Sequence, residues 1–346
     1  MERVGPVAAN ARMVGHLFGA APSSMGYFRS PALHRRIRGK LAAHRFDLIV
    51  VHCSSVAPYV ADVERIPKLL DFGDMDSQKW IAYSRFKPFP LSLAYWLEGS
   101  KLQRAEQRLA RRFDTCTCTT RAEFETLESY ATGVRTGWFP NGVDASAFQP
   151  SDEPYERDTI CFVGRMDYYP NQECMFDFCE RTFPRIRAKR PSVQLLIVGA
   201  DPSRAVRRLG RLPGVTVTGS VDQVQPWVRR AALTVAPLNI ARGTQNKILE
   251  SLAMGVPCVC SRLAAKGVDA VPGEHLLAAE EPADYADAIL RLLNDPAERR
   301  RFSEAGRKRM LSHHDWDQSM RRFDGIIESC MKEAASGSRA HGRSGR

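Results

Sequence analysis

The chain of 346 residues carries 50 Lys+Arg against 39 Asp+Glu, a formal net charge of +11, and 44% of its residues are hydrophobic. These are ordinary globular values, so they exclude a collagen, a disordered chain and a disulfide-stapled miniprotein. The length predicts two domains. No apolar run approaches the ~18 residues of a membrane span, which excludes an integral membrane protein.

The basic charge is concentrated at the two ends of the chain. Residues 1–46 hold eight Lys+Arg and one acid, and residues 334–346 hold three arginines and no acid, so the segment 47–333 is close to neutral. Net charge alone would suggest a nucleic-acid-binding protein. That class needs a continuous basic groove and a recognised motif, and the sequence indicates neither, so we expect no nucleic acid among the partners.

The nine cysteines include two CxC pairs, Cys116/Cys118 and Cys258/Cys260, both in short β-rich runs. We expect buried, reduced thiols that pack as small apolar residues, because a metal site would need further ligands nearby. Together with the lack of a recognisable signal peptide, this predicts a reducing, cytoplasmic location.

From residue 47 the chain alternates short apolar runs with helical patterns. The pattern predicts a helix at 121–131 capped by Thr120, and a helix at 31–46 with Leu33, Ile37 and Leu41 on one face. Residues 1–46 contain no convincing strand, so we expect the first domain to lack its opening units. The other elements predicted here are strands at 47–53, 68–73, 114–120 and 137–144 and helices at 76–84 and 92–112.

A polar, proline-containing stretch at 149–158 predicts a linker, after which the alternation restarts. The elements predicted beyond it are strands at 159–164, 193–199, 215–220, 233–238 and 256–261 and helices at 171–190, 203–210, 222–231, 244–255, 282–294, 296–311 and 315–333. Such alternation builds βαβ units around parallel sheets. We therefore expect an α/β protein of two Rossmann-like, doubly wound domains, 1–148 and 159–333, with the ligand in the cleft between them. The last helix is a candidate to pack back on the first domain, and the tail 334–346 is expected to be disordered.

Two constellations of the second domain suit an anion. Gly164 and Arg165 follow a predicted strand and precede a helix, where a guanidinium suits a phosphate, although a plain surface arginine is the alternative. Gly243 and Thr244 precede a helix whose first turn carries Lys247, so free amides and an ammonium would meet there.

Acidic residues extend this chemistry to both domains. Glu250 shares a helical face with the lysine three residues before it, and its carboxylate could accept two hydrogen bonds from a sugar diol; the alternative is a surface ion pair. In the first domain Asp71, Asp74 and Asp76 follow a strand. Such close acids either bind something or form a solvated loop in which Asp76 or Ser77 caps a helix.

Six aromatic residues lie within residues 80–96. Packing between two helices would account for them. The alternative is an acceptor surface for a lipid-linked sugar at an anionic membrane, used together with the basic helix 31–46. The six are Trp80, Tyr83, Phe86, Phe89, Tyr95 and Trp96.

The order of three segments resembles the glycosyltransferases of family 4, which have the GT-B fold. They are PNGVDASAF at 140–148, FVGRM at 162–166 and KILESLAMGVPCVCS at 247–261. The finer features GDMDSQKW, GRMDYYPN and ARGTQNKILE are similar to the branch associated with bacterial exosortase (PEP-CTERM) systems and exopolysaccharide synthesis.

The resemblance implies a retaining transfer that needs no metal or other cofactor. A nucleotide-sugar donor would bind the second domain, with its base near Val221, and a glycan or polyprenyl-linked acceptor would bind the first. Cations and helix amides would stabilise the leaving diphosphate, and Glu250 would hold the ribose. The residues implied in donor binding are Gly164, Arg165, Arg242, Gly243, Thr244, Lys247 and Glu250.

Two positions depart from the family pattern. Many members have a sugar-contacting glutamate where this chain has Arg242, and a phosphate-binding lysine where it has Asn171, so Lys247 must carry more of the charge or Arg242 must help it.

The first domain offers His52, Asp74 and Asp76 as catalytic candidates and Ser77 and Trp80 as acceptor contacts. The resemblance also implies a protein that is peripheral on the inner face of the plasma membrane. The alternative with the same fold is a nucleotide-sugar epimerase or an inactive, truncated relic.

Overall fold

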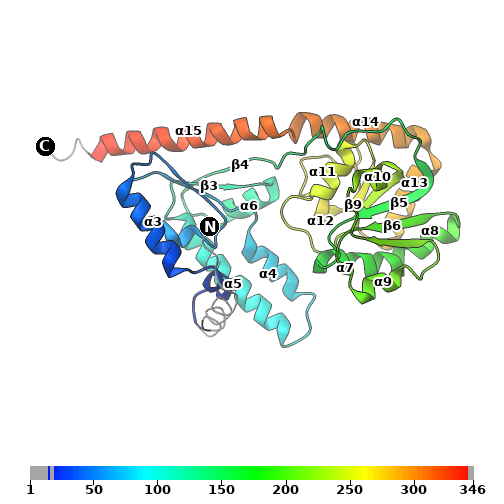
Figure 1. The fold of residues 1–346 in the computed structure, drawn as a ribbon, viewed down its shortest axis with the longest axis horizontal. Helices are drawn as coiled ribbons and strands as arrows, with labels where there is room; N and C mark the ends of the chain where they lie inside the picture. Colours follow the sequence, from blue (N-terminus) through cyan, green and yellow to red (C-terminus); the bar gives the residue numbers. More distant parts are fainter. Residues whose placement is uncertain (1–14, 16–18, 342–346) are drawn as a thin grey trace. The chain divides into compact units, whose positions relative to one another are not determined.

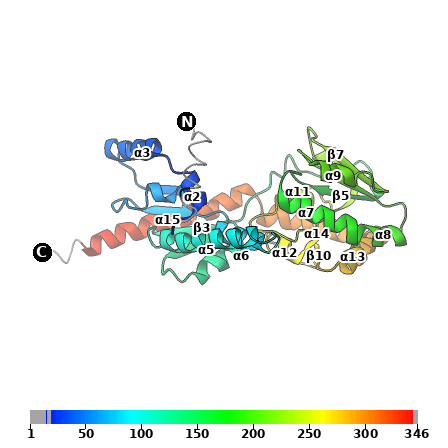
Figure 2. The same ribbon diagram turned by 90° about the horizontal axis from the view of Figure 1, so that it is seen from below.

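A computed structural model describes Gly15 and residues 19–341, with side chains up to residue 333. The chain forms two compact units, Met1–Phe139 with Met320–Arg346, and Pro140–Ser319. Each unit is built on a parallel sheet (Figures 1 and 2). The division falls after Phe139, before the linker expected at 149–158, and most of the last helix belongs to the first unit. The expectation that residues 1–46 hold no strand concerns residues that lie partly outside the described ones.

The first unit holds four parallel strands in sequential order. Its strands are β1 (Ile49–His52), β2 (Lys68–Asp71), β3 (Thr115–Cys118) and β4 (Arg135–Trp138). Its helices are α2 (Ser23–Tyr27), α3 (Pro31–Ala43), the 3-10 turn η1 (Ala57–Tyr59), α4 (Asp76–Ser84), α5 (Leu91–Ala110), α6 (Arg121–Ser129) and most of α15 (Trp316–His341).

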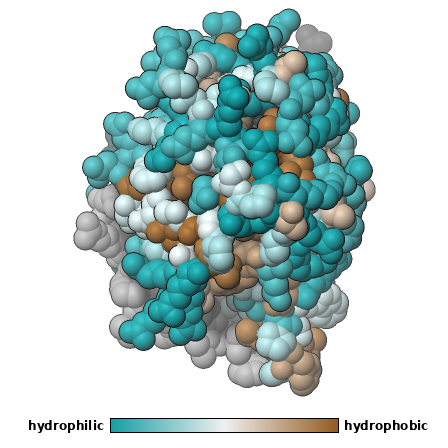
Figure 3. Space-filling view, turned by 90° about the vertical axis from the view of Figure 1, so that its right-hand side faces the viewer, coloured by the Kyte–Doolittle hydropathy of each residue, from teal (hydrophilic) through white to brown (hydrophobic). Residues whose placement is uncertain are grey.

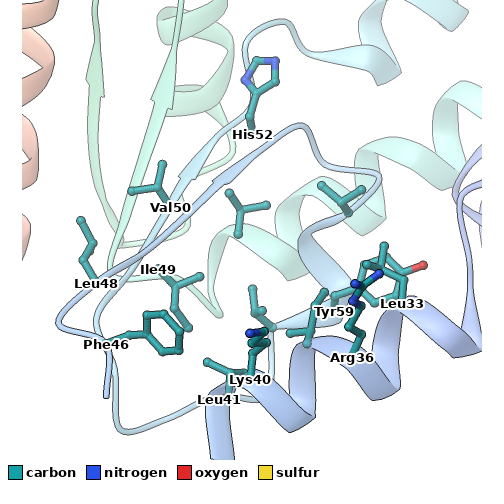
Figure 4. A pocket seen from close by; sticks show the side chains of 14 residues that line it. Leu33, Arg36, Lys40, Leu41, Phe46, Leu48, Ile49, Val50, His52 and Tyr59 are labelled. Carbon is teal, nitrogen blue, oxygen red and sulfur yellow. The ribbon is translucent and has the colours of Figure 1, made fainter. Parts of the chain in front are cut away.

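Local sequence accounts for several helix starts. The predicted cap of α6 is confirmed, because the Thr120 side chain accepts a hydrogen bond from the Glu123 amide. Helix α3 starts in the same way, with Ser30 as its cap and Pro31 in its first turn. Apolar residues of α3 and of the edge strand β1 line a groove between them, with His52 at one end (Figure 4).

The second unit holds six parallel strands in the order β7-β6-β5-β8-β9-β10. The chain moves outward from β5 in one direction, then returns and moves outward in the other, which is the doubly wound order of Rossmann folds. Its strands are β5 (Glu156–Val163), β6 (Gln194–Val198), β7 (Val215–Gly219), β8 (Ala231–Ala236), β9 (Cys258–Ser261) and β10 (Leu277–Ala279). Its helices are α7 (Tyr169–Asp177), the π-turn η2 (Phe178–Thr182), α8 (Phe183–Lys189), α9 (Arg204–Leu209), α10 (Gln225–Arg229), α11 (Asn246–Ala253), α12 (Arg262–Ala265), α13 (Pro282–Asn294) and α14 (Pro296–His313).

Each sheet is packed into an apolar core of its own unit. Both CxC pairs lie in buried strands, β3 and β9, and all nine cysteines are free thiols, eight of them buried, which confirms their predicted packing role. On the face drawn in Figure 3 hydrophilic residues predominate and hydrophobic ones form small groups.

Two findings concern the ends and the membrane. Helix α15 continues to His341, through residues that were expected to lack order, and residues 342–346 lie outside the described ones. Within the described residues, none of the helices combines the length and the apolar character that crossing a bilayer requires.

Candidate functional site

The order of the second sheet reverses between β5 and β8, and the loops that follow these two strands meet at its carboxyl edge. In open α/β sheets ligands bind at this point. The loop after β5 begins with Gly164 and Arg165, and the loop after β8 leads through Arg242 and Gly243 into α11. The topology therefore brings together the two segments that the sequence nominated separately.

Gly164 is required by close packing. A Cβ atom there would lie 2.7 Å from the Asn171 amide nitrogen, and one on Gly199, at the end of β6, would lie 1.8 Å from the Gly164 carbonyl oxygen. Asn171 in turn donates from Nδ2 to the Arg165 carbonyl at 2.8 Å. The loop after β5 is thus held tightly against its neighbours, with room for the backbone alone.

Lys247 points back toward this loop. Its Nζ donates to Asn171 Oδ1 at 2.6 Å and lies 4.6 Å from the centre of the Phe162 ring. Although it is not fully buried, the protein packed around the ammonium disfavours its charged form and lowers the pKa of Lys247 to about 8. Asn171 therefore orients the one lysine of α11.

The turn before α11 leaves one buried polar group without a partner among the described residues. Gly243 has a φ of 63°, in the left-handed region, and the Gln245 amide braces the turn by donating to the carbonyls of Arg242 and Gly243. The Thr244 hydroxyl is buried, yet no residue that the structure describes forms a hydrogen bond with it. A buried hydroxyl without a hydrogen-bond partner, placed just before a helix, can donate to an acceptor group of a ligand.

Glu250 lies one turn beyond Lys247 on α11. Burial raises the pKa of its carboxyl to about 7, and the nearby lysine opposes this shift. Among the described residues, none donates a hydrogen bond to this carboxylate. A carboxylate kept partly dry and unpaired can accept two hydroxyl donors, as from a ribose.

Two predicted donor residues are less directly placed. Arg165 is exposed and forms a bidentate pair with Asp167, with bonds of 3.1 and 2.6 Å, so it would have to exchange that carboxylate for a phosphate. Arg242 is partly buried and already engaged within the protein. Val221, expected near the base, is partly buried and packs against a small apolar cluster.

Sequence reasoning missed a second polar pair close to the reversal point. Glu173 of α7 accepts a hydrogen bond at 3.0 Å from Asn239, which follows β8, while its other carboxylate oxygen is buried without a partner among the described residues. Burial raises the pKa of this carboxyl. No motif marks the pair, since its two members come from segments far apart in the sequence.

In the first unit, His52 and Asp71 end neighbouring strands and pair at 2.7 Å through the imidazole Nδ1. The aspartate is buried and also accepts from the Thr117 hydroxyl at 3.0 Å, while the imidazole is largely exposed. In the tautomer that donates from Nδ1 to this carboxylate, Nε2 is left as the acceptor nitrogen of the exposed ring. Gly73, with a φ of 65°, leaves room for the ring: a Cβ there would lie 3.2 Å from Cε1.

The other first-unit candidates have different surroundings. Asp74 reaches solvent and Asp76 begins α4; partial loss of hydration raises the pKa of both carboxyls. Ser77 is fully buried, where its hydroxyl donates to Glu106, so the structure commits it to internal packing and not to an acceptor. Trp80 packs against Tyr95 between α4 and α5, with ring centroids 4.9 Å apart and the rings tilted by 41°.

Comparison with known proteins finds similar sequences and folds. Residues 157–295 match the family model described as glycosyl transferases group 1. The chain is 29% identical over 322 residues to the phosphatidyl-myo-inositol mannosyltransferase of Mycobacterium leprae, covering 88% of this chain and 80% of that one. It is 27% identical over 186 residues to D-inositol 3-phosphate glycosyltransferase 2 of Catenulispora acidiphila, covering 47% and 43%.

Solved structures share the fold at low sequence identity. The sucrose-phosphate synthase of Thermosynechococcus elongatus superposes with a TM-score of 0.70 at 18% identity, covering 89% of this chain and 79% of that one. The Anabaena protein Alr3699/HepE, solved with UDP, gives 0.68 at 15% identity, covering 90% and 85%.

The fold and these relatives define the chain as an enzyme, a glycosyltransferase of the GT-B fold. Residues 157–295, the part that matches the group 1 glycosyl transferase model, contain all the donor-side residues named above.

Proposed function

We propose that this enzyme transfers a hexosyl group from a nucleotide sugar to a hydroxyl of a glycan or polyprenyl-linked acceptor, with retention of configuration. The bond between the anomeric carbon and the leaving phosphate breaks as the acceptor oxygen bonds to that carbon, and negative charge grows on the diphosphate. Lys247, the Thr244 hydroxyl and the amides at the start of α11 stabilise that charge, so the protein's own groups take the place of a metal.

The proposal rests on the side chains that lie together in one short segment, residues 243–250. It combines a lysine held by Asn171, an orphaned hydroxyl and an unpaired carboxylate. A diphosphate joined to a ribose offers acceptors for the first two and two donors for the third. The likeness of GDMDSQKW and ARGTQNKILE to the exosortase-associated branch supports a role in bacterial exopolysaccharide synthesis, at the inner face of the plasma membrane.

Calorimetric titration with UDP- and GDP-sugars tests this assignment. Wild-type chain should bind one of them, and Glu250→Gln should weaken binding at least about tenfold, because two hydrogen bonds to a charged acceptor are weakened. Glu304→Gln, an exposed glutamate of α14, is the matched control. Equal affinities of all three proteins would remove the ribose role from Glu250.

The pH dependence of donor binding provides a separate prediction. Affinity should rise with pH through about 7, as Glu250 ionises, and fall above about 8, as Lys247 loses its proton. The diphosphate of a nucleotide sugar does not titrate in this range. Titrations at several pH values check this; in Glu250→Gln the acid limb should disappear and the alkaline limb should stay. Binding that is flat across this range would contradict both roles.

A further inference from the structure

The connection between α4 and α5 exposes an apolar surface. We call residues 85–97 the hairpin tip; its sequence is RFKPFPLSLAYWL. Phe89 is 80% exposed and Trp96 is 50% exposed. Six large apolar side chains of the tip face solvent, namely Phe86, Phe89, Leu91, Leu93, Trp96 and Leu97. Six exposed apolar side chains within one segment of thirteen residues indicate a site of association, whereas single exposed residues are normal.

The tip is held firmly from within its own unit. Helices α4 and α5 lie side by side (Figure 1) and cross so closely that a Cβ on Gly99 would lie 2.7 Å from the Ile81 side chain. The buried Glu98 accepts hydrogen bonds from the backbone amides of Ser23 and Ser24, at 3.1 and 2.8 Å. The exposure of the tip therefore belongs to an ordered, anchored hairpin.

The aromatic residues of this region divide into two groups. Trp80, Tyr83 and Tyr95 face one another between the helices, with ring centres 4.9 and 6.3 Å apart, which confirms packing for these three. Trp96 instead is 50% exposed, and Leu93 lies three residues before it and four residues before Leu97, so Leu93 neighbours both on the helix surface. The buried residues of α5 all lie at or beyond Glu98. The exposed apolar side chains therefore belong to the first two turns of this helix.

The charged residues within the tip, Arg85 and Lys87, are both cations, whereas Lys79 at the other end of α4 lies near Asp74 and Asp76. Between residues 79 and 104 the only acid is Glu98, which is buried and engaged by α2. The cations of this stretch are Lys79, Arg85, Lys87, Lys101 and Arg104. Apolar and aromatic side chains rimmed by cations match the interface of an anionic bilayer, where rings and stems enter the headgroup layer and cations meet lipid phosphates.

We propose that the hairpin tip inserts into the surface of an anionic lipid bilayer and holds the enzyme there. The proposal rests on the proposed function in one respect only, that a polyprenyl-linked acceptor is presented at such a surface. Helix α4 begins directly after the loop that carries Asp74, at the carboxyl edge where His52 lies. The same hairpin would thus attach the acceptor-side edge of this unit to the membrane that carries the acceptor.

Flotation with vesicles of phosphatidylglycerol, or of phosphatidylcholine alone, tests the proposal without donor or acceptor. We expect the full chain to float with anionic vesicles at low salt and Phe89→Ser/Trp96→Ser to lose at least about tenfold in affinity. Leu212→Ser/Leu311→Ser, which removes two exposed leucines of the second unit, is the matched control and should float like wild type. Calorimetric donor binding should be the same in all three, so failure of the donor site and failure of membrane attachment are distinguishable.

A depth measurement sharpens the result. Vesicles with brominated acyl chains should quench tryptophan fluorescence in wild type, and Trp96→Phe should still float but lose most of the quenching. Unchanged flotation of the double serine variant would overturn the proposal. A second result would also overturn it: the wild-type chain does not bind vesicles but forms a dimer, and the double serine variant is a monomer. The tip would then be a contact between two copies of the chain.

Discussion

Replacing Lys247 with methionine is expected to weaken donor binding about 100-fold at neutral pH and to leave the second unit at least as stable. The ammonium is the charged group that the fold aims at the reversal point of the sheet, through its 2.6 Å bond to Asn171. Losing a charge-assisted bond to a diphosphate in a partly dry site costs about 3 kcal/mol, or a factor of about 100 in affinity.

The stability side of this prediction follows from the lowered pKa. Below about pH 8 the folded protein holds a charged Lys247 that it disfavours relative to the unfolded chain, so removing the charge relieves a cost in folding. Methionine keeps most of the apolar stem and its contact with Phe162. The unpaired Asn171 oxygen offsets part of the gain, so we expect a melting temperature equal to or a few degrees above that of wild type.

Calorimetry and thermal melting together check this result. Lys308→Met, an exposed lysine of α14, is the matched control and should bind donor like wild type. Donor affinity of Lys247→Met within about tenfold of wild type would show that another cation carries the diphosphate; Arg165 and Arg242 would be the next to test. A collapse in melting temperature would show that the lysine is structural.

The sequence predicted the succession of elements well, because short apolar runs and amphipathic helices report local burial. Helix α4 occupies the predicted residues 76–84, and α13 the predicted 282–294. Single short elements were missed, among them β10, whose three residues are too few for a periodic pattern. The segment 137–144, predicted as a short strand that runs into a turn, contains the end of β4 at Trp138, before Pro140.

Pairs between distant residues could not be predicted from sequence alone. Asn171 was identified only as a missing lysine, whereas its contact with a residue 76 positions away gives it a role. Ser77 looked like an acceptor contact because of its neighbours in GDMDSQKW. Nothing in the local sequence shows that Glu106 of α5 lies beneath Ser77. The backbone amide of Ser77 donates to the Glu106 carboxylate at 2.9 Å. Tertiary contacts, which no periodicity encodes, decided both cases.

The segment 243–250 contains groups that lower the folding stability of the free protein, which a helix with a purely structural role would lack. Lys247 and Glu250 both have pKa values shifted toward neutrality by burial, and the Thr244 hydroxyl is buried without a bond among the described residues. Each of these lowers folding stability in the free protein and is relieved by a ligand with matching groups. Such local violations are expected where a site has to bind.

Substituting His52 with alanine is expected to reduce turnover at least about 100-fold while leaving donor affinity unchanged. The imidazole is held by Asp71 through Nδ1 at 2.7 Å, and the aspartate is fixed by Thr117 and by the Gly73 amide at 3.2 Å. This leaves Nε2 as an acceptor at the exposed carboxyl edge of the sheet. A positioned acceptor for the proton of an attacking hydroxyl contributes 10²–10⁴-fold in typical enzymes, about 3 kcal/mol or more.

The Asp71→Asn variant separates positioning from catalysis. Its amide can donate to Nδ1, so the proton moves to Nε2 and the outward nitrogen becomes a donor; turnover should fall nearly as far as in His52→Ala, with the same donor affinity. His44→Ala, an exposed histidine of the same unit, is the matched control.

Asp74→Asn decides between the acidic loop and the histidine as the catalytic group, because the Asp74 carboxylate lies near the same edge of the sheet. If turnover collapses in Asp74→Asn and survives in His52→Ala, the catalytic group is the loop carboxylate, and the pair of His52 and Asp71 serves only to hold the ends of β1 and β2 together.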